Sequence, residues 1–207
     1  MEHNKNKENT KRRLIDAVAH VFRTEGYAGL GVNKISRIAG VNKKLIYRYF
    51  KSFDRLVEAY VVETDYWMKF AECMRHLPLP EGMEETQHFI ASALKEQFKY
   101  FYAEPEMQQL ILWEVSTDSE LMRSIHRTRE SMGQDLLELT DPYLSENKVN
   151  FRAVAALLVG GIYYTILHSR FNGGKFADVD LKTDSGRKAI LQAIDDIVEL
   201  VFERSAR

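Results

Sequence analysis

The sequence predicts an all-α protein of roughly nine helices. Apolar residues recur at helical spacing in one segment after another, as on the buried stripe of an amphipathic helix. Proline and glycine separate these segments, most clearly at Leu77-Pro78-Leu79-Pro80 and at Asn172-Gly173-Gly174. Beyond Ser52, no stretch alternates apolar and polar residues as a half-buried strand would.

The first predicted helix lies between Thr10 and Gly26. Thr10 is placed to cap it, Gly26 is placed to end it, and the spacing between them predicts about four turns. Its apolar stripe consists of Leu14, Ile15, Val18, Val21 and Phe22.

The next segment, ISRIAGVNKKLIYRYF over residues 35–50, predicts two short helices around a glycine turn. Gly40 can adopt the positive φ of a tight turn, and Asn42 is a favourable N-cap for the second helix. The buried side of the crossing consists of Ile35, Ala39, Val41, Ile46 and Tyr49, with the small Ser36 at the close approach. Lys43, Lys44, Tyr47 and Arg48 remain on the exposed side. This is the organisation of a helix-turn-helix, whose second helix enters the major groove of DNA.

Ser52 can cap the helix that follows, with Asp54 favourably placed in its first turn. Asp118 and Asn150 are predicted caps of two later helices, and Asp141-Pro142 is a predicted end. The predicted helices after the helix-turn-helix cover residues 53–76, 84–103, 105–116, 118–140, 150–172 and 187–204.

The order TKRRLIDAVAHVFRTEGY, VNKISRIAGVNKKLIYRYF and KSFDRLVEA resembles the N-terminal domain of the tetracycline-repressor (TetR) family. The matching positions are Gly26-Tyr27, Ala39-Gly40-Val41, Lys43, Ile46-Tyr47, Tyr49-Phe50, Ser52 and Leu56. The sequence departs from the family at Gly31, where a capping Thr or Ser is usual, and also at Asn42, Lys44, Leu45 and Phe53. The resemblance implies a DNA-binding domain at residues 1–52 and a helical ligand-binding and dimerisation domain at residues 53–207.

Charge is distributed unevenly along the chain. Residues 1–52 carry 12 Lys and Arg against 4 Asp and Glu, a net charge of +8, whereas the remainder has a net charge of −9. A basic end concentrates attraction to phosphate, and the acidic remainder is discouraged from lying on DNA. We therefore expect double-stranded DNA as a partner. We expect Lys34, Arg37, Lys43 and Lys51 to contact phosphates, and Lys44, Tyr47 and Arg48, beside Asn42, to reach base edges or the adjacent backbone.

The last two predicted helices carry more apolar surface than one body hides, which predicts a homodimer. Small residues in the first of them permit close approach of a partner, and a symmetric pair of heads would read a palindromic operator. TetR-like proteins form a four-helix interface from these helices. The expected interface residues are Ala156, Leu157, Gly160, Gly161, Tyr164, Ile190, Ile194, Ile197 and Val201. The alternative is that Gly160-Gly161 accommodates a neighbour within the same subunit.

The body is rich in aromatic residues, which as a helical stripe can be plain core. The resemblance to TetR-like regulators instead implies a cavity for a small apolar or aromatic effector. The expected wall consists of Trp67, Phe70, Phe98, Phe101, Trp113 and Tyr164, with Glu114 or His168 as polar anchors.

Several other classes have little support in the sequence. The uncharged segment 153–169 is at the short end of a membrane span and contains Gly-Gly, tyrosine and histidine, so a helix buried on several sides explains it better. His88, His126 and His168 lack local metal-ligand spacing, and no catalytic or cofactor motif is present. One cysteine fits a reducing compartment. We therefore expect a cytoplasmic regulator, most simply a repressor, with no metal and no cofactor. The alternatives are a DNA-associated architectural or partner-binding protein without an inducer, and a helical enzyme.

Overall fold

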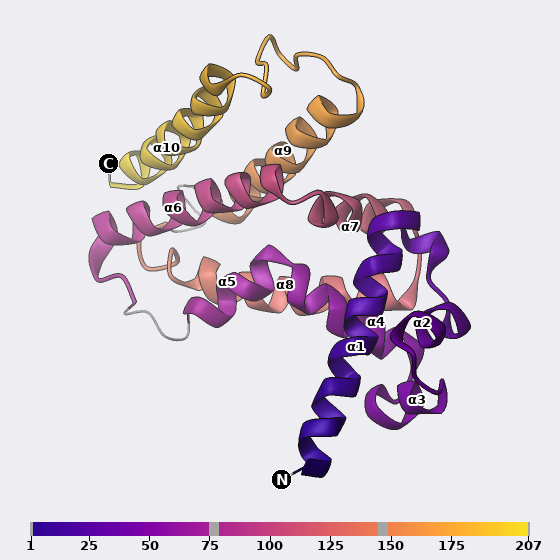
Figure 1. Cartoon of the computed structure of the whole chain (residues 1–207). Coiled ribbons are helices and arrows are strands. Elements are labelled where there is room, and N and C mark those ends of the chain that lie inside the picture. The colour runs from indigo at the N-terminus through magenta and orange to yellow at the C-terminus, as the bar shows by residue number, and fades with distance from the viewer. Residues whose placement is uncertain (1, 75–78, 145–148, 207) are drawn as a thin grey trace.

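The computed structural model describes residues 2–74, 79–144 and 149–206, and in these ranges the chain forms ten α-helices, one 3-10 turn and no strand (Figure 1). The all-α prediction is confirmed. The elements are α1 (Glu2–Glu25), η1 (Tyr27–Gly29), α2 (Val32–Ala39), α3 (Lys44–Phe50), α4 (Phe53–Thr64), α5 (Tyr66–Met74), α6 (Gly82–Ala103), α7 (Pro105–Ser116), α8 (Glu120–Glu138), α9 (Phe151–Phe171) and α10 (Asp184–Ala206).

The N-terminal helices form a small cluster in which α1 packs on α2 and α4, and α3 packs on α4. In Figure 1 this cluster lies at the opposite end of the molecule from α10. Its centre consists of fully buried aliphatic side chains, which the predicted stripe of the first helix and the helix crossing both supply. These include Leu14, Val18, Val21, Ile35, Ile46 and Leu56.

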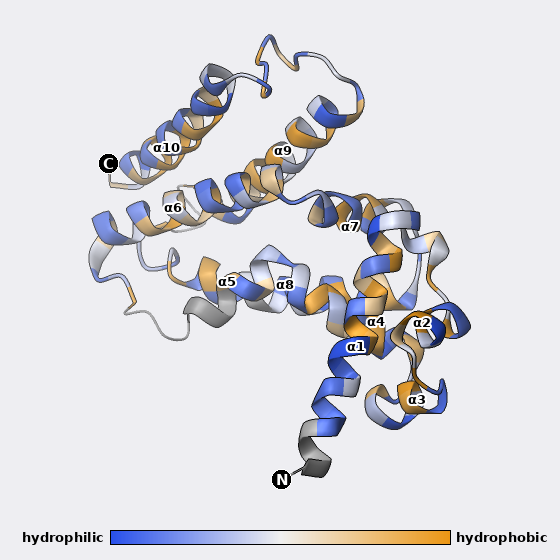
Figure 2. Cartoon of the chain, in the orientation of Figure 1, coloured by the Kyte–Doolittle hydropathy of each residue, from blue (hydrophilic) through white to orange (hydrophobic). Residues whose placement is uncertain are grey.

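The first helix begins earlier than predicted. Thr10 lies inside α1, and its hydroxyl donates to the carbonyl of Asn6 at 2.8 Å instead of capping the helix. Residues on its N-terminal side are hydrophilic (Figure 2), and α1 nevertheless continues through them. The predicted cap is therefore wrong, because a threonine hydroxyl can equally bond back to the preceding turn of a continuous helix.

A second correction concerns the predicted helix 53–76, which is two helices within the described residues, with its expected end at His76 outside them. Asp65 interrupts it with an extended backbone (φ −70°, ψ 130°). The Asp65 Oδ1 accepts hydrogen bonds from the backbone N–H groups of Trp67 (2.9 Å) and Met68 (3.2 Å). Asp65 thus ends α4 and caps α5, as an aspartate preceding a helix often does.

The other caps lie close to their predicted places. Ser52 Oγ accepts from the N–H of Arg55, and Asn150 Oδ1 accepts from the N–H of Ala153, as predicted. The cap of α8 is Ser119, whose Oγ accepts from the N–H of Met122, and not its neighbour Asp118.

The larger part of the molecule is organised around α6, on which α9 and α10 both pack. On its other sides α6 contacts α5 and α7, and α8 packs on α4 and α5. Phe98 and Phe101 of α6 are buried at 1% and 0% exposure, so this helix supplies much of the core. Its central position brings α5, α7, α8 and α9 around a common space.

Contrary to the sequence-based expectation, α9 is not buried on several sides. By length and composition it could cross a membrane, and only 22% of its apolar window is buried. Leu157 and Tyr164 are 78% and 56% exposed. One face packs on α6 and α7, and the other lies on the surface.

Asp65 is fully buried and ion-paired with Arg129 of α8 at 2.5 Å, which generates the first prediction. Replacement Asp65→Ala removes a cap and leaves a buried guanidinium with one carboxylate partner, so we expect a loss of about 3–5 kcal/mol of unfolding free energy. Urea denaturation measures it. Glu63→Gln, which breaks an exposed ion pair with Arg12, is the control and should cost less than about 1 kcal/mol. Equal losses in the two variants would contradict this role of Asp65.

Candidate DNA-binding surface and effector cavity

The turn between α2 and α3 is built as the sequence predicts. Gly40 has φ 62°, ψ 38°, the left-handed conformation that glycine adopts at low cost. Its carbonyl accepts a hydrogen bond from Arg13 Nη2 at 3.2 Å, which ties the turn to α1. Ile35 of α2 and Ile46 of α3 are both fully buried against this cluster. The crossing of the two helices is thereby fixed by one hydrogen bond to α1 and by the burial of one isoleucine from each helix.

The opposite side of α3 is open to solvent. The N-cap residue of α3 is Lys43 and not Asn42, but Asn42 Oδ1, one residue earlier, accepts a hydrogen bond from the N–H of Lys44 at 2.9 Å at the start of the helix. Tyr47 is 50% exposed, and the Arg48 guanidinium lies 5.8 Å from the centre of the Tyr49 ring. This surface carries Asn42, Lys43, Lys44, Tyr47, Arg48 and Lys51, all exposed, and we call it the basic face of α3.

Two further predicted DNA contacts lie on α2. Arg37 is exposed beside the turn. Lys34 is half-buried, and its Nζ lies 2.5 Å from Glu25 Oε2 of α1. Lys34 is therefore occupied by an ion pair, which a phosphate would have to displace.

A cavity of about 940 Å³ lies in the larger part of the molecule, between α5, α8, α9 and the α6–α7 pair. Trp67 of α5 and Glu114 of α7, two of the predicted wall residues, line it. Aliphatic side chains from four helices supply a large apolar part of the remaining wall. These are Ile90 and Leu94 of α6, Ile111 of α7, Leu136 and Leu137 of α8, and Val159 of α9.

Arg129 of α8 connects the cavity wall to the α4–α5 junction. Its Nε and Nη2 donate to Asp65 Oδ2 at 3.0 and 2.5 Å, and its Nη1 donates to Glu114 Oε2. Burial alone would lower the pKa of Arg129, but attraction to Asp65 and Glu114 raises it above its ordinary value. The guanidinium therefore stays charged and joins α4, α5, α7 and α8 through one group.

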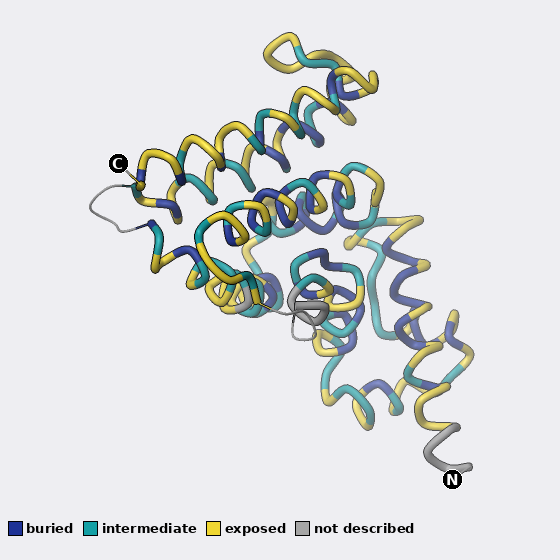
Figure 3. Tube along the Cα trace, turned by 90° about the vertical axis from the view of Figure 1, so that its left-hand side faces the viewer, coloured by how far each residue is buried: buried dark blue, intermediate teal, exposed yellow. Residues whose placement is uncertain are grey.

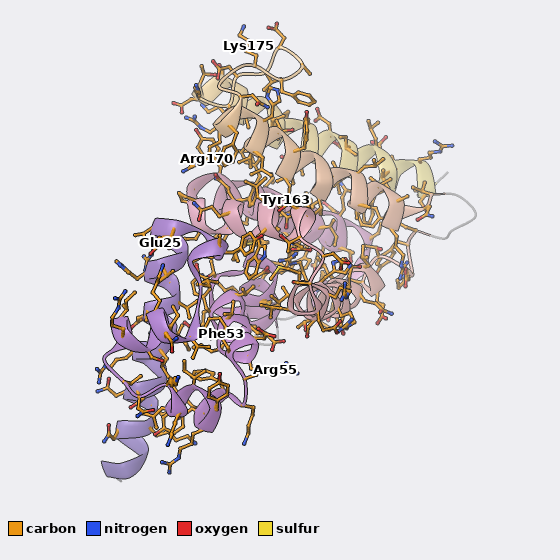
Figure 4. The ribbon with its side chains drawn as sticks, turned by 90° about the vertical axis from the view of Figure 1, so that its right-hand side faces the viewer. Glu25, Phe53, Arg55, Tyr163, Arg170 and Lys175 are labelled. Carbon is orange, nitrogen blue, oxygen red and sulfur yellow. The ribbon has the colours of Figure 1, made fainter. Side chains whose placement is uncertain are left out.

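Tyr163 of α9 points into the interior of the body (Figure 4) and lines the cavity. Its hydroxyl accepts a hydrogen bond from Trp67 Nε1 at 3.2 Å, which joins two walls. Burial raises the pKa of Tyr163 to about 12, so the group is a neutral hydrogen-bonding partner at pH 7.

The other six predicted wall residues do not line the cavity. Phe98 and Phe101 face the core, where Phe101 packs on Tyr163 with ring centres 4.6 Å apart. Phe70 packs on Tyr66 and Phe89. Tyr164 is exposed and His168 is half-buried, and both pack against the loop residue Phe176. These predictions are wrong for one common reason. The rotation of each helix about its axis, which residue type alone does not reveal, decides which aromatic residues face the cavity.

Trp113, the sixth of these residues, packs against the N-terminal cluster and not against the cavity. Its ring stacks on Tyr27 of η1, with centres 5.0 Å apart and planes 9° apart, and it also packs on Phe22. Two turns earlier on the same helix, Glu106 accepts from the Tyr60 hydroxyl at 2.7 Å and pairs with Arg23 at 3.1 Å. α7 therefore contacts the N-terminal cluster through one face and the cavity through Ile111 and Glu114.

Sequence reasoning missed most of the cavity residues on α8 and α9. On α8 they are His126, Arg127, Arg129, Glu130, Ser131, Gly133 and Gln134, and on α9 they are Arg152, Ala155, Ala156, Val159, Gly160 and Tyr163. The α9 residues recur at three- and four-residue intervals, a signal that could have been found. Among the described side chains, no group of three His, Cys, Asp or Glu could hold a metal ion.

The predicted interface residues divide into two sets. Leu157, Tyr164 and Ile197 are exposed apolar side chains, and an added Cβ at Gly160 or Gly161 would meet nothing within 4 Å. The alternative of a close neighbour within the subunit is therefore wrong at both glycines. The prediction for Ile194 is wrong, because this side chain is 2% exposed and packs inside the subunit. Ile190 and Val201 are half-buried, and Leu200, 63% exposed, was not foreseen.

Residues 14–60 match the family model described as bacterial regulatory proteins, tetR family. The match includes the second half of α1, all of α2 and α3, and most of α4. No curated protein matches the chain by sequence.

Solved structures share the fold across nearly the whole chain. A TetR-family transcription regulator from Marinobacter aquaeolei has a TM-score of 0.63 at 18% identity, covering 93% of this chain and 97% of that one. FadR of Bacillus subtilis in complex with stearoyl-CoA has a TM-score of 0.62 at 18% identity, covering 92% and 97%. NalD of Pseudomonas aeruginosa, a repressor of a multidrug efflux pump, has a TM-score of 0.53 at 15% identity, covering 91% and 95%. The N-terminal part of the chain therefore matches the tetR family model, and the chain as a whole shares the fold of these regulators.

Proposed function

We propose that this protein is a dimeric repressor that binds a palindromic operator and is released by a small molecule. The observation that carries this proposal is the basic face of α3, exposed on a helix whose opposite side is fixed in the N-terminal core. The proposed division is a DNA-binding domain at residues 1–52 and a ligand-binding and dimerisation domain at residues 53–207. A protein that acts on chromosomal DNA would work in the cytoplasm.

On DNA, the roles of the basic residues follow from their positions. Lys44, Tyr47 and Arg48 project from α3 and are assigned to base edges or the adjacent backbone, with Asn42 holding the start of the helix. Arg37, Lys43 and Lys51 flank that helix and are assigned to phosphates, which supply affinity and register. Lys34 joins them only when its ion pair with Glu25 opens.

The proposed dimer interface is formed by the exposed apolar surface of α9 and α10. Leu157, Tyr164, Ile197 and Leu200 are each more than a third exposed, and the outward side of α10 is exposed along its length (Figure 3). The space beside Gly160 and Gly161 would admit a partner helix. Ala156 is exposed in the subunit and lies where this face borders the cavity, whereas Ile194 is excluded by its burial.

The cavity supports release by an effector. Its volume of about 940 Å³ and its largely aliphatic wall suit a small molecule with an apolar body. The similar FadR structure contains stearoyl-CoA. Two helices would transmit binding to the head, since the α4–α5 junction reaches the cavity through Arg129 and α7 reaches it through Glu114. An effector that favours a head spacing unsuited to the operator weakens DNA binding by its differential affinity.

An architectural DNA-binding protein without an inducer is the second candidate. That reading predicts a filled core, and a cavity of this size speaks against it. A helical enzyme has no catalytic motif in its favour.

Binding to DNA is the first test of this function. We expect affinity for the best site selected from a random-sequence DNA pool to fall by about 10³ or more between 50 and 200 mM salt, because several phosphates are neutralised. Simultaneous replacement of Lys43, Lys44 and Arg48 by Ala should abolish selective binding and flatten the salt dependence. Electrophoretic shift titrations measure both.

The matched control replaces three exposed lysines far from α3, at positions 175, 182 and 188, by Gln. Figure 4 shows Lys175 at the opposite end of the molecule from Phe53. This control should bind the site as the wild type does. Retained selective binding by the α3 variant would overturn the proposed DNA-binding surface.

Oligomeric state is the second test. Leu157→Arg places a charge at a position 78% exposed in the subunit, so it should leave folding unchanged and convert the dimer to a monomer. Sedimentation velocity measures the mass, and circular dichroism checks the fold. Val62→Arg, also an exposed apolar position but on α4, should remain dimeric. A Leu157→Arg dimer as tight as the wild type would show that this face is not the interface.

A further inference from the structure

The ionic groups at and directly behind the inner wall of the cavity carry an excess of negative charge. Asp65, fully buried, and Glu114 share a single guanidinium, that of Arg129. Formally this triad has a charge of −1, in a region where an uncompensated charge is costly. The other oxygen of Glu114, Oε1, lies 3.5 Å from Nδ1 of His126, which also lines the cavity.

The two arginines at the rim do not reverse this sign, because each has an acidic partner. Arg127 Nη2 lies 3.0 Å from Glu120 Oε1. Arg152 forms a two-point ion pair with Asp141, at 2.6 and 3.0 Å. Glu130, in contrast, lines the cavity, is exposed, and has no ion-pair partner in the described part of the chain. The lining itself holds three arginines and two glutamates, but with the acidic partners Asp65, Glu120 and Asp141 included the formal charge is −2.

The remaining walls suit the apolar body of a ligand. Leu94, Ile111 and Val159 present aliphatic surface from three helices, and Trp67 and Tyr163 add aromatic rings. Aromatic rings attract organic cations through their negative faces. An anion would find only arginines that already have carboxylate partners.

From this arrangement we propose that the cavity binds an amphiphilic organic monocation, with its charged centre at Glu114 and Glu130 and its apolar body against the aliphatic wall. The proposal rests on the proposed function, because it names the chemical class of the effector. It also distinguishes this chain from FadR, whose ligand stearoyl-CoA is an anion.

Two probes of the same shape and opposite charge test the sign of the cavity directly. Tetraphenylphosphonium and tetraphenylborate are titrated separately into the full-length protein by isothermal calorimetry. We expect the phosphonium to bind at least about tenfold more tightly, because its charge is attracted by carboxylates at the wall. Glu114→Gln and Glu130→Gln should each weaken phosphonium binding several-fold. Asp135→Asn, an exposed change of the same charge on α8 outside the cavity, should not.

Each outcome has a distinct meaning. Equal or tighter binding of the borate would overturn the proposal, and so would the absence of phosphonium binding in a preparation that binds its DNA site. In both cases the DNA-binding function would stand. If Glu114→Gln loses stability, Glu130→Gln still decides, since Glu130 takes part in no described ion pair. Phosphonium binding that leaves operator affinity unchanged would support the cation site and contradict its role in release.

Discussion

Asp65 is fully buried where α4 ends, and its two carboxylate oxygens do different work. One oxygen caps α5 through the N–H groups of Trp67 and Met68, and the other accepts from Arg129. Because Arg129 also pairs with Glu114, four helices depend on one buried charge cluster. This cluster therefore connects α4, which follows α3, to the wall of the cavity. Leaving any of its charges unpaired would be costly.

α7 provides a second connection between the same two regions. Trp113 stacks on Tyr27 of the N-terminal cluster, and its neighbour Glu114 faces the cavity. A molecule that displaces Glu114 therefore acts on a helix whose adjacent residue supports η1 and α1. The N-terminal cluster is therefore held by the body at two places, the α4–α5 junction and α7. A domain held in this way can tilt as a rigid unit, and such a tilt would change the spacing between the two DNA-binding domains of the proposed dimer.

Local chemistry made much of the fold predictable, and long-range packing explains the rest. Ser52, Asn150 and Gly40 act on their own turns, so their roles follow from residue type and spacing. The capping of α5 by Asp65 is also local, but the ion pair of Asp65 with Arg129, 64 residues away, follows from no local pattern. Tyr163 and Tyr164 are chemically identical, but one residue is about 100° of helix rotation. Only the packing of α9 on α6 decides that Tyr163 faces the cavity and Tyr164 the surface.

The proposed release requires that filling the cavity moves the two DNA-binding domains of the proposed dimer relative to one another. Pulsed electron–electron resonance on a dimer labelled at Asn33→Cys, with Cys73 replaced by Ser, measures the distance between the two α2 helices. Asn33 is exposed on α2 and outside the proposed DNA contacts. We expect saturating tetraphenylphosphonium to shift the distribution of this distance, and the operator to shift it back. An unchanged distribution at full occupancy of the cavity would contradict this expectation.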